Sequence, residues 1–218
     1  MPKKIILTVY LLLFIFFIVG CTVIEDMNSK NNQEFQNHEE SLYSYFPQNT
    51  GMHYQYRGKG IEYASFIRDI KHSKKPFVQI HDNNGGTIVA TVYKVEEDKV
   101  SIIKSQEEFY SDESLLLDIE ENEKEKEVIL KSPIQKGTNW ETNNKRKEIV
   151  DINMSLKVPA GRFYDVIKVK SSLLDEKNGV VTYSYYAQNT GLIKRESIGD
   201  EFEVISELET YGNFKLNR

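Results

Sequence analysis

The sequence predicts an all-β fold, an antiparallel curled sheet of about 10–12 strands that forms either an open half-barrel or a β-sandwich. Three observations support this prediction. Residues 150–158 alternate apolar and polar side chains, which is typical of a strand with one buried face. The pairs Asn84-Gly85 and Asn178-Gly179 lie between runs of strand-forming residues, as in tight hairpins. No segment with a helical period separates the predicted strands, so a parallel sheet of βαβ units is not expected.

The predicted strands follow one another with short turns between them. The first group is expected at 51–57, 61–70, 77–81, 87–95 and 99–104. The second group is expected at 127–131, 138–142, 147–158, 163–171, 180–186, 192–197 and 203–209. Between the groups, 106–126 is expected to be a charged loop or hairpin tip, or one exposed helical turn, with its charges in solvent. The 13 Tyr and 11 Phe of the chain also favour a sheet.

The N-terminus predicts export. Two lysines precede an uncharged stretch at 5–19, which indicates that 1–20 is a secretory signal peptide. This stretch is short for a membrane span, which takes about 20 residues. Residues 21–44 are rich in Asn and Gln and are expected to be a flexible tether. The β domain is expected at 45–212.

The residues at the end of the signal peptide are Ile18-Val19-Gly20-Cys21, and Cys21 is the single cysteine of the chain. This tetrapeptide resembles the lipobox of bacterial lipoproteins. The resemblance implies that diacylglycerol is attached to the sulfur of Cys21 and that a peptidase cuts before it. Two acyl chains hold a protein stably on a membrane, so the implied location is the extracytoplasmic face of the cell membrane. The alternative is an uncleaved signal anchor in which Cys21 has no role.

A second group of residues runs through the predicted β domain. Its members are Pro47 and Gly51; Gly137 and Trp140; Val158-Pro159-Ala160-Gly161, Phe163, Val166 and Val169; and Tyr185-Tyr186-Ala187 with Gly191-Leu192-Ile193-Lys194. Their spacing resembles a run found in uncharacterised β-rich lipoproteins of Gram-positive bacteria. The resemblance implies a curled antiparallel sheet like that of bacterial lipoprotein carriers. It brings no catalytic residue with it.

No catalytic, cofactor-binding or metal-binding residue is predicted, and the chain is not expected to be an enzyme. The sequence has no Gly-x-Ser-x-Gly elbow, no phosphate-binding glycine loop and no His-Glu-x-x-His motif. The histidines are His38, His53, His72 and His81. Because His53 and His81 alternate with apolar neighbours in predicted strands, both are expected to be exposed. A net charge of −5 gives no expectation of nucleic-acid binding.

Three functions remain open at the level of sequence. The first is a non-catalytic, membrane-anchored β domain that binds an envelope component or partner protein. The second is a carrier that holds a hydrophobic ligand such as a lipid in the curled sheet, and the third is a hydrolase with an unmarked site. Alternate tyrosines such as Tyr183 and Tyr185 either line a groove on the concave face or pack as ordinary sheet residues. An enclosed apolar cavity would favour the carrier, and a flat apolar patch would favour a protein partner. A deep polar cleft with a carboxylate of perturbed pKa would favour the enzyme.

Overall fold

The computed structural model describes residues 42–120, 123–175 and 179–213. The predicted signal peptide, Cys21 with the residues that resemble a lipobox, the predicted tether up to residue 41 and Asn178 of the second predicted hairpin turn lie outside the described residues. All described residues belong to one unit, Glu40–Arg218. No helix in the described part has the length and hydropathy that a membrane span requires.

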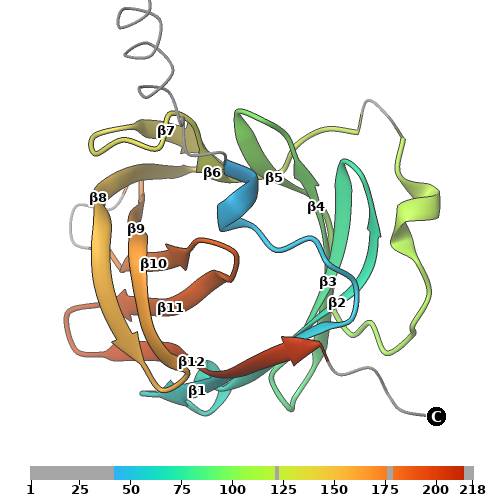
Figure 1. Ribbon diagram of the computed structural model, residues 1–218, viewed down its shortest axis with the longest axis horizontal. Helices are drawn as coiled ribbons and strands as arrows, with labels where there is room; N and C mark the ends of the chain where they lie inside the picture. The colour runs from blue at the N-terminus through green and yellow to red at the C-terminus, as the bar shows by residue number, and fades with distance from the viewer. Residues whose placement is uncertain (1–41, 121–122, 176–178, 214–218) are drawn as a thin grey trace, which may run out of the picture. The chain divides into compact units, whose positions relative to one another are not determined.

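In the described residues, twelve antiparallel strands form one curled sheet, which confirms the predicted all-β class (Figure 1). The strands are β1 (Met52–Lys59), β2 (Phe66–Lys74), β3 (Phe77–Asn83), β4 (Ile88–Val95), β5 (Lys99–Gln106), β6 (Glu127–Lys131), β7 (Asn139–Thr142), β8 (Lys145–Val158), β9 (Gly161–Leu173), β10 (Val181–Ala187), β11 (Gly191–Ile198) and β12 (Glu203–Asn213). Because all of them share one sheet, the half-barrel is the correct alternative and the two-sheet sandwich is not.

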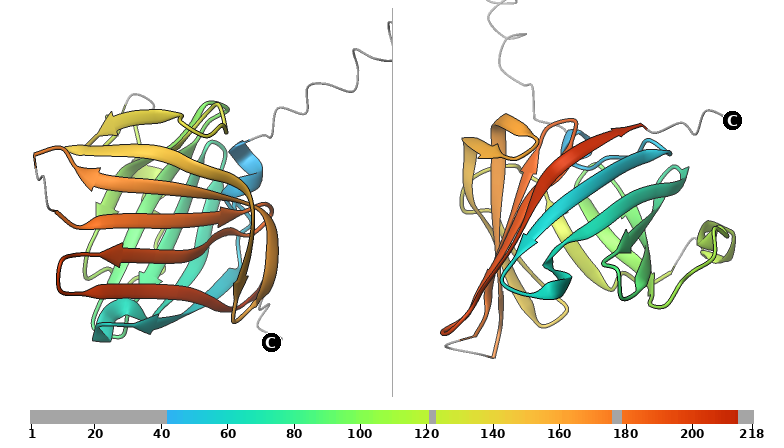
Figure 2. Two further views of the ribbon diagram at one scale, coloured as in Figure 1. Left: turned by 90° about the vertical axis from the view of Figure 1, so that its left-hand side faces the viewer. Right: turned by 90° about the horizontal axis from the view of Figure 1, so that it is seen from below.

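The sheet curls until its two edge strands, β6 and β7, lie side by side (Figures 1 and 2). The strand order is β6-β5-β4-β3-β2-β1-β12-β11-β10-β9-β8-β7, so the first and last strands pair at its centre. Side chains join the edges: the Trp140 indole Nε1 donates to the Val128 carbonyl at 3.0 Å, and the Val128 N–H donates to Thr142 Oγ1 at 2.8 Å. We call this junction of Val128, Trp140 and Thr142 the seam.

One end of the curled sheet is filled by the first described residues, 42–47, which we call the plug. They include the short 3₁₀ helix η1 (Leu42–Tyr45). Leu42, Tyr45 and Phe46 are 1%, 0% and 4% exposed, and the Tyr45 hydroxyl donates to the Asp165 carbonyl at 3.1 Å. Leu42 therefore belongs to the packed core, although it lies in the range predicted as tether.

The predicted strand at 61–70 is wrong over its first residues, which form a turn with the 3₁₀ helix η2 (Glu62–Ala64). Gly58 permits this turn, because a Cβ at that position would lie 2.2 Å from the Ala64 carbonyl carbon. The turn is held by two hydrogen bonds, from the Gly58 N–H to Ser65 Oγ at 2.8 Å and from Ser206 Oγ to the Ala64 carbonyl at 2.7 Å. The missing side chain thus lets the turn pack closely against β1.

The single apolar face predicted for 147–158 is only partly correct. The pairing of β8 with β9 shifts register three times between Ile149 and Leu156, and Asn153 has a φ of 57°. Lys147 and Ile149 are buried before these shifts, whereas Val158 is buried after them. An extra residue in a strand exchanges the faces of all residues that follow, and strict alternation cannot anticipate it.

The segment at 107–119 covers the outer face of β3 and β4 and contains the helix η3 (Leu115–Asp118). It is anchored by Gln79, whose Oε1 accepts from the Leu115 N–H at 2.8 Å. His81 packs edge-on against Phe109, with ring centroids 5.3 Å apart. His81 is 4% exposed, so the prediction that it is exposed is wrong. Alternation placed His81 on the outer face correctly, but the loop buries that face, and burial lowers the pKa of His81.

Candidate functional site: a cavity inside the curled sheet

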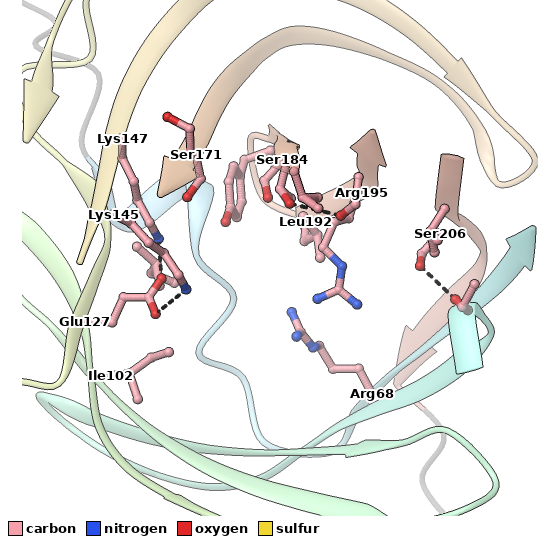
Figure 3. A pocket seen from close by; sticks show the side chains of 18 of the residues that line it. Arg68, Ile102, Glu127, Lys145, Lys147, Ser171, Ser184, Leu192, Arg195 and Ser206 are labelled. Carbon is pink, nitrogen blue, oxygen red and sulfur yellow. Dashed lines mark hydrogen bonds and ion pairs between the residues drawn. The ribbon is translucent and has the colours of Figure 1, made fainter. Parts of the chain in front are cut away.

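A cavity of about 560 Å³ lies inside the curled sheet (Figure 3). Phe46 and Pro47 of the plug contribute to its lining, as do Ile61 and Tyr63 of the turn between β1 and β2. Ile61 and Tyr63 are 55% and 54% exposed, so the cavity opens at the end where this turn lies. We call this opening the mouth. A cavity of this size is typical of small-molecule sites.

Strand pairing arranges the inner side chains of β8 to β12 in two rows. The row nearer the mouth consists of Lys147, Ser171, Thr182 and Ser197. The deeper row consists of Val169, Ser184, Arg195 and Ser206. Because alternate residues of a strand face the same side, one register brings these hydroxyls and cations onto one wall.

Two arginines point toward each other inside the cavity (Figure 3). Arg68 of β2 is 9% exposed, and its Nε and Nη2 donate to the two carboxylate oxygens of Asp82, each at 2.7 Å. Both guanidinium groups lie near one ring, because Arg195 is 5.3 Å and Arg68 5.7 Å from the centroid of Phe66. Among the described residues, no carboxylate lies within ion-pair distance of Arg195.

A second charged group lies beside the seam. The Glu127 carboxylate of β6 bridges two lysines of β8, with Oε1 at 2.7 Å from Lys147 Nζ and Oε2 at 2.9 Å from Lys145 Nζ. The side chains of Glu127 and Lys147 are 14% and 8% exposed. Burial alone would raise the pKa of Glu127, but the two lysines hold it below its ordinary value. Burial in turn lowers the pKa of Lys147. The pair links β6 to β8 across β7.

The cavity lining is cationic although the chain is acidic. Its cationic side chains are Arg68, Arg195, Lys145 and Lys147, and its carboxylate is Glu127. Asp82, which lies beside the lining, compensates the charge of Arg68. Positive charge is therefore in excess in the cavity of a chain whose net charge is −5.

Most of the residues that the sequence singled out lie outside the cavity, although Pro47, Tyr186 and Leu192 of the second group line it. Cys21 is outside the described residues. His53, His72 and His81 do not line the cavity, and His53 is partly exposed, with its Nδ1 2.7 Å from Asp69 Oδ1. In the part of the chain that the structure describes, no three His, Cys, Asp or Glu side chains are grouped to hold a metal ion.

The tyrosine run of β10 is divided between the two faces of the strand. Tyr186 lines the cavity, whereas Tyr183 and Tyr185 lie on the opposite face. There the Lys168 ammonium is 4.0 Å and 5.3 Å from the ring centroids of Tyr183 and Tyr185, and the Tyr185 hydroxyl donates to Glu196 Oε2 at 3.0 Å. These two rings therefore pack against charged side chains outside the cavity, so ordinary sheet packing is the correct one of the two alternatives for Tyr183 and Tyr185.

Sequence reasoning missed both arginines of the cavity. Arg68 had a local signal, because it alternates in phase with Phe66 and Ile70 on the buried face of β2. A cation at such a position is buried and needs a partner or a function. Arg195 had no comparable signal, since its place beside Ser184 and Ser206 depends on the pairing of three strands.

No protein-family model matches the chain. No curated protein matches it either. Two solved structures are similar in fold. One is a protein of Bacteroides fragilis, inferred to be exported and described as having a YmcC-like fold; it is 13% identical, with a TM-score of 0.45 over 77% of this chain and 98% of that chain. The other, inferred to be a lipoprotein of Parabacteroides distasonis, is 14% identical, with a TM-score of 0.39 over the same shares.

With TM-scores below one half, these similarities carry no ligand, activity or anchoring over to this chain. The resemblance to β-rich lipoproteins of Gram-positive bacteria stays a prediction.

Proposed function

We propose that the chain is a non-catalytic, lipid-anchored binding protein on the extracytoplasmic face of the cell membrane. The lipobox at 18–21 supports an anchor of diacylglycerol on Cys21. The binding role rests on one observation, the cavity of about 560 Å³ with its polar inner wall and open mouth. Its ligand is a small envelope component, because a cavity of this size admits a small molecule and not a folded partner.

The chemistry of the lining supports binding without catalysis. Nucleophilic catalysis by a hydroxyl needs a general base within reach. The hydroxyls of the cavity have no histidine beside them in the lining. Both carboxylate oxygens of Glu127 are engaged by Lys145 and Lys147, so this group is not positioned to accept a proton from a substrate.

A carrier of a hydrophobic ligand is the second candidate. Ile102, Ile129 and Leu173 give the lining an apolar portion, which favours a ligand with some apolar surface. A wholly apolar ligand fits less well, since it would remove water from Arg195 without replacing its hydrogen bonds.

Native mass spectrometry of the full chain, extracted gently from its membrane, tests the binding role. We expect a co-purifying small molecule on the wild-type protein and its loss in Ser171→Trp, which fills the cavity from β9. Lys170→Trp is the matched control, because the neighbouring residue faces the other side of the strand. Retention of the molecule by Ser171→Trp would exclude the cavity as its site.

The anchor is tested by fractionation. Cys21→Ala should leave the precursor without lipid, and metabolic labelling with a palmitate analogue should mark the wild-type chain alone. If Cys21→Ala yields a cleaved form that stays on the membrane, the proposed anchor is wrong.

A further inference from the structure

We propose that the ligand of this cavity carries a carboxylate or phosphate group and that Arg195 is the residue that binds it. This inference rests on the proposed binding function and adds the chemical class of the ligand. It is carried by the charges of the lining and by the arrangement of the two arginines.

The first step is the unequal compensation of the arginines. Asp82 takes two hydrogen bonds from Arg68 at 2.7 Å, so the charge of Arg68 is largely neutralised within the protein. Arg195 lies against the same Phe66 ring, and no carboxylate among the described residues pairs with it. Contact with an aromatic face stabilises a guanidinium group but satisfies none of its N–H donors.

The second step is the position of Arg195 in the sheet. Its cross-strand partners on the inner wall are Ser184 and Ser206, and Arg68 faces it from β2 (Figure 3). Ser206 is already engaged with the Ala64 carbonyl at 2.7 Å. An anion in front of Arg195 would thus receive a planar, two-pronged guanidinium donor, the geometry that suits carboxylate and phosphate.

The third step is the charge beside the seam. Glu127 is shared by Lys145 and Lys147, so one carboxylate compensates two cations there. For the two arginines there is likewise one carboxylate, that of Asp82, which pairs with Arg68. Each charged group therefore keeps one positive charge in excess, and the low-dielectric walls of the sheet strengthen charge interactions inside it. An anionic ligand relieves this repulsion, whereas a neutral one does not.

Calorimetry with the full lipidated chain in phosphatidylcholine nanodiscs tests the proposal. The probes are benzoate, phenyl phosphate and benzamide, the last of which has the shape of benzoate without its charge. We expect benzoate or phenyl phosphate to bind and benzamide not to bind. Comparison of the two anions tells which group the site prefers. Arg195→Gln should weaken binding of the anion roughly tenfold to hundredfold. Arg57→Gln, an exposed arginine of β1, should leave it unchanged.

Arg195→Lys separates a folding defect from lost recognition. It keeps the charge and loses the two-pronged donor, so binding should fall between wild type and Arg195→Gln, with thermal stability monitored for each variant. Equal binding of benzamide and benzoate, binding of neither anion, or full binding by a folded Arg195→Gln would overturn the anionic class. These outcomes are distinct from failure of the binding function, in which Ser171→Trp leaves the co-purifying molecule in place.

Discussion

Glu127→Gln is expected to weaken the seam, because it removes the carboxylate that compensates the buried Lys147. Removing one partner of a buried ion pair typically costs about 3–5 kcal/mol. Lys145 is 35% exposed and regains contact with water, so the loss of its ion pair adds little to the change in the free energy of unfolding. Glutamine can still accept a hydrogen bond from Lys147, and the cavity admits water. We therefore expect a loss of about 2–3 kcal/mol in the free energy of unfolding, which lowers the melting temperature by roughly 4–12 °C.

The fluorescence of Trp140 provides the assay, since it is the single tryptophan and its indole donates to Val128, the residue after Glu127. Urea unfolding followed by Trp140 emission should show a lower midpoint for Glu127→Gln. Glu141→Gln is the control, because its pair with Arg146 is exposed at 56% and 62% and is worth under about 1 kcal/mol. Equal losses in the two variants would refute the reasoning.

A double variant tests the cause of the loss. Glu127→Gln combined with Lys147→Met removes the uncompensated charge and should recover most of the lost stability. If the double variant is less stable than Glu127→Gln alone, desolvation of Lys147 is not the reason for the effect.

Two further predictions concern His81 and Gly58. Burial lowers the pKa of His81 from its ordinary 6.5, so its contribution to stability is complete above pH 6.5 and is lost as the pH falls through the lowered folded value. The hydrogen-exchange protection factors of 107–119, which correct for the change in intrinsic exchange with pH, should therefore fall as the pH is lowered below 6.5, and unchanged protection would contradict this. Gly58→Ala places a Cβ 2.2 Å from the backbone of Ala64 and should cost about 1–3 kcal/mol in thermal unfolding. Gly212→Ala, with no atom within 4 Å, should cost far less, and equal losses would argue against the close approach at Gly58.

Local sequence patterns predicted the sheet, because a tight turn and the alternation of a strand both depend on residues that are close in sequence. Strand alternation and short turns anticipated most of the observed strands, including the hairpin at Asn84-Gly85, where the Asn84 side chain accepts from two backbone N–H groups. The failures have nonlocal causes. The burial of His81 comes from a loop that follows two strands later, and the turn at 61–65 depends on contact with Gly58 and Ser206.

The site was harder to predict than the fold. The N-terminus predicts export and the searched catalytic motifs are missing from the sequence, but no local pattern marks a cavity. Arg68 and Arg195 meet because β2 and β11 are both close to the central pair, β1 and β12, of the sheet order. That arrangement is set by the pairing of the first strand with the last, which the sequence pattern does not specify.

A crystal structure of the chain with para-bromobenzoate would test the central claim most directly, because the anomalous signal of bromine locates the ligand without ambiguity. We predict a bromine peak inside the curled sheet, with the carboxylate bound to the Arg195 guanidinium. A carboxylate bound away from Arg195, or bromine found only on the outer surface, would contradict the account.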